Sequence, residues 1–182
     1  MSTISLNVSQ AGDKKDDVFY GDSRSDIIDV GDGNNIVYAN EGENVITAGS
    51  GSDIIYSGSG SDIINAGDGD NIVYAGEGNN QITTGAGKDA IYTGFGNDII
   101  SSGALDDLID AGEGNNTIDA GTGNDRVFSG SGLDVFKLNK GDGFVTIYGV
   151  QPNDKLTVAG KAEDYKIEAV DGNQKYRLKK VI

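Results

Sequence analysis

Hydrophobic and polar positions repeat along this chain with a period of nine residues. Aligning the chain on itself at this spacing gives 14 units without insertion or deletion, from Gly12 to Lys137. The shared form is small-Gly-x-Gly-x-Asp/Asn-x-Ile/Val-x, as in AGSGSDIIY from Ala48. The eighth position is always apolar, and we expect it to form the core. Its residues are Phe19, Ile28, Val37, Ile46, Ile55, Ile64, Val73, Ile82, Ile91, Ile100, Ile109, Ile118, Val127 and Phe136.

This pattern predicts a short strand around each eighth position and a turn in the Gly-rich residues before it, because Ile, Val and Tyr favour strands. Each turn carries the chain to the opposite sheet, so two units make one coil of 18 residues. We therefore expect an all-β fold, a right-handed parallel β-roll solenoid, with two flat sheets facing each other across the apolar column. Seven coils at a strand spacing of ~4.8 Å give a rod roughly 30 Å long.

Composition supports a recurring turn over an ordinary globular core. The 182 residues are 36% hydrophobic and include 29 Gly and one Pro. Gly is tolerated at this density where a fixed fraction of positions takes backbone conformations closed to other residues. The regular β-branched residues argue against a disordered low-complexity chain.

Charge and missing residue types exclude several functions. The 29 Asp plus Glu against 14 Lys plus Arg give a net charge of −15, which excludes a nucleic-acid-binding surface and suits cations as partners. Cys and His are absent, which excludes zinc sites, disulfides and catalysis by imidazole or thiolate, so an enzyme is not expected. No apolar run reaches the ~20 residues of a membrane span, and the start MSTISLNVSQ lacks signal-peptide features, so we expect export by another route.

The units resemble a known repeat. AGSGSDIIY and TGFGNDIIS are similar to the nonapeptide GGxGxDxUx of the bacterial RTX (repeats-in-toxin) β-roll proteins, the hemolysin-type calcium-binding repeat family. The resemblance covers Gly12 to Lys137. It implies several calcium ions between successive turns on the same side, held by backbone carbonyls and by position-six carboxylates. The chain departs from the family pattern at the first Gly, which is usually Ala, Ser or Thr, and at position six.

Position six supplies the candidate calcium ligands, and Asp and Asn alternate there. The five units with Asn carry an acid at position three instead: Asp32, Glu41, Asp68, Glu77 and Glu113. Stacked carboxylates ~5 Å apart repel by about 1 kcal/mol per pair in water, so a cation is needed most where two Asp are adjacent. We expect the strongest sites at Asp89/Asp107 and Asp107/Asp125. The column reads Asp17, Asn35, Asp53, Asn71, Asp89, Asp107, Asp125 on one side and Asp26, Asn44, Asp62, Asn80, Asp98, Asn116, Asp134 on the other.

Three alternatives stay open at this point. A calcium-independent Asp/Asn-zippered roll would have Asn amides donating to neighbouring Asp carboxylates. An ice-binding solenoid would need outward Thr and Asn ladders, and only Gly121-Thr122-Gly123-Asn124 has that form. An enzyme, or a module of one, is disfavoured because every candidate Asp lies in a repeated unit, whereas catalytic groups are normally unique.

Position nine predicts an aromatic ladder on one sheet. Since position eight points inward, positions seven and nine point outward, and Tyr should lie beside Val18, Ile36, Ile54 and Ile72. This ladder is either good strand chemistry or a face for a weak homodimer or a surface partner. Its members are Tyr20, Tyr38, Tyr56, Tyr74 and Tyr92.

The chain is expected to divide into a capping strand at 1–11, the roll at 12–137 and a β cap at 138–182. From Leu138 onward the net charge is +2, and residues 144–150 and 155–160, with a hairpin around Asp171-Gly172-Asn173, are predicted as antiparallel strands. This ending resembles the one that follows the repeats in secreted RTX proteins, which implies type I secretion. We expect a secreted or cell-surface module with a structural, adhesive or secretion-linked role.

Overall fold

The structure is a computed structural model that describes residues 15–138, 143–159, 165–169 and 175–180. Within these residues the chain forms short strands and no helix, so none of them could cross a membrane as a helix. The strands are β1 (Val18–Tyr20), β2 (Ile27–Asp29), β3 (Ile36–Tyr38), β4 (Val45–Thr47), β5 (Ile54–Tyr56), β6 (Ile63–Gly67), β7 (Ile72–Gly76), β8 (Gln81–Thr84), β9 (Ala90–Thr93), β10 (Ile99–Ser101), β11 (Leu108–Asp110), β12 (Thr117–Asp119), β13 (Gly123–Phe128), β14 (Val135–Leu138), β15 (Gly143–Tyr148), β16 (Lys155–Val158), β17 (Tyr165–Ala169) and β18 (Lys175–Lys180).

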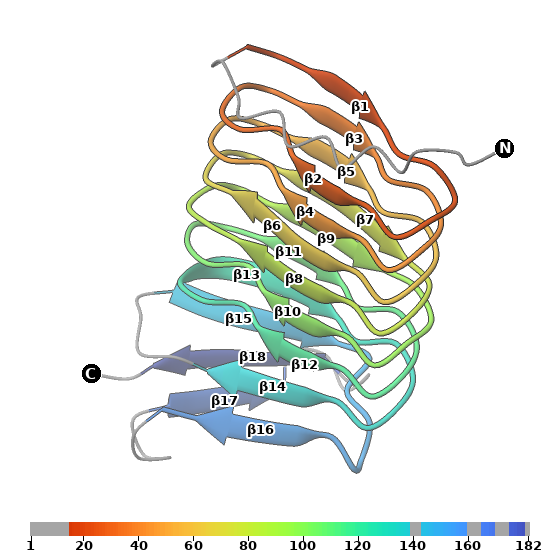
Figure 1. Ribbon diagram of the computed structural model, residues 1–182. Coiled ribbons are helices and arrows are strands. Elements are labelled where there is room, and N and C mark those ends of the chain that lie inside the picture. Colours follow the sequence, from red (N-terminus) through yellow and green to blue (C-terminus); the bar gives the residue numbers. More distant parts are fainter. Residues whose placement is uncertain (1–14, 139–142, 160–164, 170–174, 181–182) are drawn as a thin grey trace, which may run out of the picture.

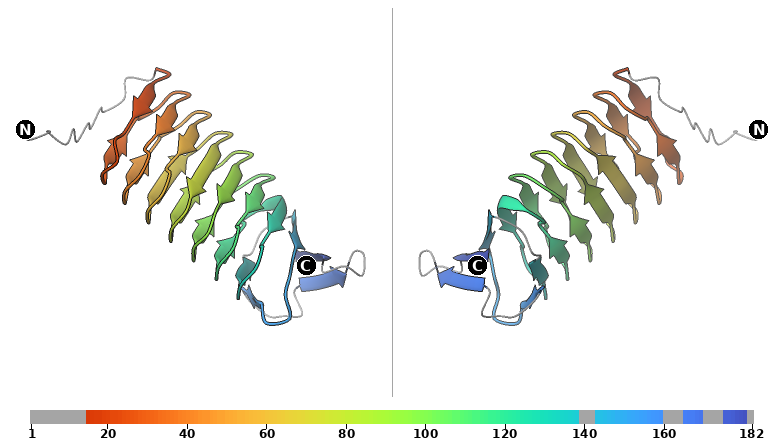
Figure 2. Two further views of the ribbon diagram at one scale, coloured as in Figure 1. Left: turned by 90° about the vertical axis from the view of Figure 1, so that its right-hand side faces the viewer. Right: turned by 90° about the vertical axis from the view of Figure 1, so that its left-hand side faces the viewer.

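The strands form a parallel β-solenoid, as the nine-residue period predicted, but it has about eight turns instead of seven because β15 and β16 continue the roll. Odd-numbered strands from β1 to β15 lie side by side in one sheet, which ends in β18 and β17, and even-numbered strands form the other sheet. Figures 1 and 2 show the two sheets facing each other along the roll. Strands two apart pair in register, for example Ile55 with Val37 and Val73. Each coil therefore places every residue over its equivalent 18 positions earlier.

Two inward columns fill the space between the sheets. The predicted column at position eight is buried, with Ile55, Ile91 and Ile109 fully enclosed and Phe19 only partly so at the N-terminal end. Position one supplies a second inward column of small residues, including Ala39 and Ala48. Position one follows directly after a strand, where the chain turns toward the opposite sheet. The space between the sheets is narrow at this point, so small side chains fit. The flanking positions seven and nine point outward, as the strand pattern predicted.

The two Gly of each unit are needed because successive turns lie directly on one another. Gly51 has a φ of 128°, and a Cβ on it would collide with the carbonyl oxygen of Gly33 in the preceding coil. The same collision repeats along the roll, so position four is closed to most side chains. Lys15, Arg24 and Leu105 are the exceptions at this position, and of these Leu105 takes a φ of 79°.

The region after the repeats corrects one expectation. Strands β15 and β16 pair parallel with β13 and β14, so the strands predicted within 144–150 and 155–160 continue the roll over residues 143–148 and 155–158 instead of pairing antiparallel with each other. Their registers carry the inward column onward, with Ile147 over Val127 and buried. Antiparallel pairing begins with β18, which pairs with β15 and β17. The turn at 171–173 and the capping strand predicted within 1–11 lie outside the described residues.

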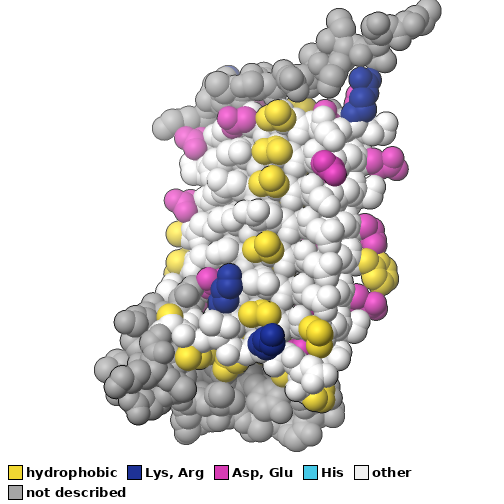
Figure 3. Space-filling view, turned by 60° about the horizontal axis from the view of Figure 1, so that its bottom comes forward, with side chains coloured by type: hydrophobic (Ala, Val, Ile, Leu, Met, Phe, Trp, Pro, Cys, Tyr) yellow, Lys and Arg dark blue, Asp and Glu magenta, His cyan; other side chains and the backbone are white. Residues whose placement is uncertain are grey.

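The outer faces of the two sheets differ. On the first sheet the five Tyr of the ladder stack face to face, with ring centroids 4.9–5.1 Å apart and planes within 3–11°. The second sheet faces the viewer in Figure 3, where a single file of hydrophobic side chains runs along the roll. Exposed position-seven residues of that sheet are Ile27, Val45, Ile63 and Ile99. Exposed apolar side chains thus occur on the outer faces of both sheets.

Candidate metal sites in the turns

The position-six side chains lie buried in the turns along the two edges of the roll. All of them are buried except Asp17, which is partly exposed near the N-terminal end of the described chain. The structure brings the seven predicted residues of each edge into one column and keeps the two columns apart. From the second residue of each column onward, Oδ1 of the side chain accepts the N–H of the position-six residue in the preceding coil. This bond spans 2.7–3.0 Å, as between the Asn35 N–H and Asp53 Oδ1.

In the Asn turns, the second side-chain atom closes the turn. The Nδ2 group of Asn35 donates to the carbonyls of Gly31 and Gly33 in its own turn, at 3.1 and 3.2 Å, and to Ala48 of the next coil at 3.4 Å. The other Asn turns repeat the bonds to their own carbonyls: Asn44, Asn71, Asn80 and Asn116. The zipper hypothesis placed these amides on Asp carboxylates, and that placement is wrong for position six.

In seven of the Asp turns the equivalent atom is a buried oxygen without a hydrogen-bond partner, whereas Oδ2 of Asp26 accepts the Asp22 N–H at 3.1 Å. Because Oδ1 makes the same bond in both kinds of turn, Oδ2 of Asp takes the place of Nδ2 of Asn, facing carbonyl oxygens. It is buried and has no hydrogen-bond partner at Asp53, Asp62, Asp89, Asp98, Asp107, Asp125 and Asp134. A buried acceptor without a donor costs about 1–3 kcal/mol, and more when it is charged. A proton or a cation would remove that cost.

Burial also makes these carboxylates hard to ionise without a cation. It raises the pKa of Asp53, Asp125 and Asp134 to about 6. The pKa of Asp107 rises to about 7, first through burial, against the lowering effect of the Asp89 N–H, and then through the charges of Asp89 and Asp125 on either side. The run of three Asp is therefore where a cation has most charge to neutralise.

Four hydroxyl groups at position one belong to the Asp turns, and the sequence prediction missed them. Ser57 Oγ donates to the Ala75 carbonyl of the next coil at 2.7 Å, and Thr84 and Ser102 make the equivalent bond, whereas Ser129 donates to Tyr148, which pairs with position nine. The first three acceptors are position-one carbonyls, as are those that the Asn35 and Asn44 amides reach in Asn turns. The signal was present in the sequence, because Ser or Thr at position one occurs only in units with Asp at position six.

Asp154 is a second residue that the sequence prediction missed. Its Oδ1 accepts the Asp134 N–H at 3.0 Å, so it continues the second column beyond the repeats. Its Oδ2 accepts the Gln151 N–H at 2.7 Å and is therefore not free. An Asp directly before the strand of residues 155–158 was the available signal, but it stands 20 residues after Asp134 instead of 18.

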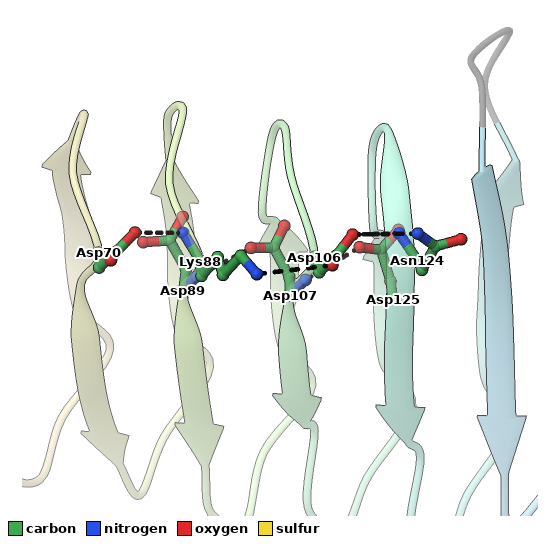
Figure 4. A network of polar contacts seen from close by, with 7 residues as sticks. All are labelled: Asp70, Lys88, Asp89, Asp106, Asp107, Asn124 and Asp125. Carbon is green, nitrogen blue, oxygen red and sulfur yellow. Dashed lines mark hydrogen bonds and ion pairs between the residues drawn. The ribbon is translucent and has the colours of Figure 1, made fainter.

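An exposed ladder at position five runs beside the Asp column (Figure 4). Asp70 Oδ1 accepts the Lys88 N–H at 2.7 Å, and Lys88 Nζ lies 3.7 Å from Asp106 Oδ2. Asp106 Oδ1 accepts both the N–H and the Nδ2 of Asn124, which lowers the pKa of Asp106. Amide-to-carboxylate bonds of the kind that the zipper hypothesis requires thus occur at position five. They lie in solvent and leave the buried Oδ2 atoms of position six unpaired.

The oxygen ligands of the Asp turns fit a hard cation that backbone carbonyls can coordinate. Each Asp turn offers one carboxylate oxygen and nearby carbonyls, and calcium takes such ligands, whereas thiolate- or imidazole-seeking metals find none. Among the described residues no three acidic side chains converge on one point. A metal here would therefore rest mainly on main-chain carbonyls. The position-three acids serve the turns differently, since Asp32 and Asp68 accept backbone N–H groups of the next coil.

Comparison with known proteins agrees with this geometry. A family model described as RTX calcium-binding nonapeptide repeat (4 copies) matches residues 11–46, 29–64, 38–73, 65–100 and 101–136. No curated protein matches the chain.

Proposed function

The chain belongs to the RTX calcium-binding nonapeptide repeat family, and on this premise we propose that it is an extracellular β-roll that folds or stiffens when calcium enters its Asp turns. Its family makes it a calcium-binding β-roll module. The proposal adds the ligands, the extracellular setting and a structural, adhesive or secretion-linked role. One observation carries it: seven buried Oδ2 atoms lack any hydrogen-bond partner, in turns where the equivalent Asn atom bonds carbonyl oxygens.

Calcium binding at these turns is coupled to folding. An ion that binds only the stacked turn stabilises it by RT ln(1 + [Ca]/Kd) per site. Extracellular sites of this class have a Kd of roughly 10⁻⁴ to 10⁻³ M, so cytosolic calcium does not fill them. Type I secretion fits this property, because the chain would remain loosely folded until it met calcium outside the cell. We place the tightest binding in the run Asp89, Asp107 and Asp125, where the carboxylates are adjacent.

Circular dichroism and thermal unfolding test this proposal. Between a chelator and calcium on the order of 10 mM, ellipticity should become more β-like and the melting temperature should rise. At ten times Kd each site contributes about 1.4 kcal/mol. Magnesium at the same concentration is the control and should act weakly, because it demands near-ideal octahedral geometry and dehydrates reluctantly. An identical spectrum and melting temperature in chelator and calcium would overturn the proposal and favour the metal-independent roll.

We also propose that the Tyr ladder forms a weak homodimer. From β1 to β9 the outward positions seven and nine of the first sheet are uncharged, which matters because the chain as a whole carries −15. Stacking already covers part of each ring, and Tyr56 and Tyr74 are 38% and 39% exposed. The area left to bury is therefore modest, and association should be weak.

Sedimentation velocity in saturating calcium tests the dimer. Replacing Tyr38, Tyr56 and Tyr74 together by Thr keeps strand propensity and removes aromatic area. The matched control replaces Ile27, Val45 and Ile63 by Thr on the second sheet. Loss of dimer in the Tyr variant alone supports the proposal. A parent that stays monomeric at high concentration, or equal loss in both variants, contradicts it.

A further inference from the structure

We infer that the roll contains two kinds of turn, and that only the Asp turns take calcium. The five Asn turns, at Asn35, Asn44, Asn71, Asn80 and Asn116, are closed by their own amides and bind none. This inference rests on the proposed calcium function and deepens it by saying which turns are filled. The described Asp turns with a free Oδ2 then set the upper limit of sites at seven.

The first argument is that the amide already occupies the site. In the Asn71 turn, Nδ2 donates to Gly67 and Gly69 at 3.1 and 2.9 Å, so the carbonyls that would face an ion face N–H groups instead. An amide NH₂ offers a cation no lone pair and directs two partly positive hydrogens at it. Calcium could enter only by displacing both bonds and the amide together.

The second argument is that the amide cannot turn round to admit calcium. Exchanging Oδ1 and Nδ2 of Asn71 would place an oxygen among the carbonyls, as in an Asp turn. The NH₂ would then face the Asp53 N–H, which now donates to Asn71 Oδ1 at 3.0 Å. Two donors would meet in a buried site, and the Asp53 N–H would lose its acceptor. The stacking of the coils therefore fixes the amide orientation.

The third argument comes from the hydroxyl groups, which vary with the turn type. In the Asn units position one is Val or Ala, and the Asn35 and Asn44 amides donate to position one of the next coil. Position one is Ser or Thr in five of the seven Asp turns with a free Oδ2, and three of these hydroxyls donate to the same carbonyl of the next coil. These hydroxyls therefore bond the neighbouring coil, and the buried Oδ2 keeps no hydrogen-bond partner. The sequence thus distinguishes the two turns at two separate positions.

The decisive experiment adds one site. Asn116→Asp replaces the amide, which bonds Ala111 and Gly114, by a carboxylate at the same place. Asn115→Asp is the matched control, because it makes the same charge change one residue away on an exposed side chain whose Oδ1 keeps the Leu133 N–H. Calcium bound per chain is counted by equilibrium dialysis with metal analysis. We expect N116D to bind one ion more than the parent, and N115D to bind the same number.

The reverse change removes one site and does not threaten folding. Asp53→Asn should bind one ion fewer and melt at a higher temperature in chelator, because its new amide closes the turn. Asp70→Asn, exposed at position five, is its control and should change neither.

The outcomes separate this inference from the proposed function. A parent that binds no calcium overturns the proposed function itself. A parent that binds calcium, with N116D gaining no ion or D53N losing none, overturns only the division into two kinds of turn. A parent that binds clearly more than seven ions does the same. If N116D fails to fold in chelator, the count is made in calcium, and D53N gives the independent answer.

Discussion

Replacing Asp107 by Asn should have opposite effects with and without calcium. The pKa of Asp107 is about 7 in the metal-free fold, against 3.8 for the ordinary group, chiefly because the carboxylate is buried. At pH 8 the difference of about three units corresponds to about 4 kcal/mol spent on keeping the charge in the fold. Asn removes that charge and adds a donor. At 2–4 °C per kcal/mol for a chain of this size, the melting temperature in chelator should rise by roughly 8–16 °C.

Calcium should raise the melting temperature of the same variant less than that of the parent. It loses the ion at residue 107 and separates the carboxylates of Asp89 and Asp125, so the tightest sites should disappear from the titration. Scanning calorimetry in chelator and calcium, with isothermal titration at pH 8, measures both effects. Asp106→Asn is the control, because Asp106 is the exposed neighbour whose side chain bonds the position-five ladder and not the buried position-six column.

The reasoning is refuted if D107N melts at or below the parent in chelator. It is equally refuted if the variant keeps the parent's high-affinity stoichiometry. The first result would mean that the buried charge is not costly, and the second that affinity does not follow the number of adjacent carboxylates.

Three further predictions follow from the same geometry. The pKa in the folded state is about 6 for Asp53, Asp125 and Asp134 and about 7 for Asp107, above the ordinary 3.8, so protonation stabilises the fold. In metal-stripped buffer the melting temperature should therefore fall as pH rises from about 4 to about 8. A melting temperature that does not change with pH would contradict this. Gly51→Ala should lower the free energy of unfolding in urea by at least about 2 kcal/mol, with or without calcium, because its Cβ meets the Gly33 carbonyl. The control Ser50→Ala leaves the backbone unstrained and should lower it much less. Leu105→Gly should raise stability by about 0.5–1 kcal/mol in the same assay, because Leu105 is 54% exposed and held at a φ of 79°; a loss of stability would show that its side chain makes a contact worth more than the strain.

The nine-residue period was enough to predict the strands, the 18-residue coil, the inward column and the outward Tyr, because each follows from the alternation of side chains about a strand. It was not enough to predict how Asn71 bonds, since Asp and Asn both suit turns and only the stacked carbonyls decide between them. The period did not predict the parallel pairing of β15 and β16, because Val127 and Ile147 stand 20 residues apart although they stack. Which Asp turns hold ions remains a prediction.

The bonds between position-six side chains and backbone N–H groups all point the same way along the chain. Each N–H finds its acceptor in a residue that comes later in the sequence, so every coil is completed by its successor. A chain that leaves a narrow channel C-terminus first would therefore find each acceptor already outside when the matching N–H arrives. On the second edge the series ends at Asp154, which accepts the Asp134 N–H. Asp154, beyond the last repeat, would then emerge before the repeats and supply the first acceptor of that edge.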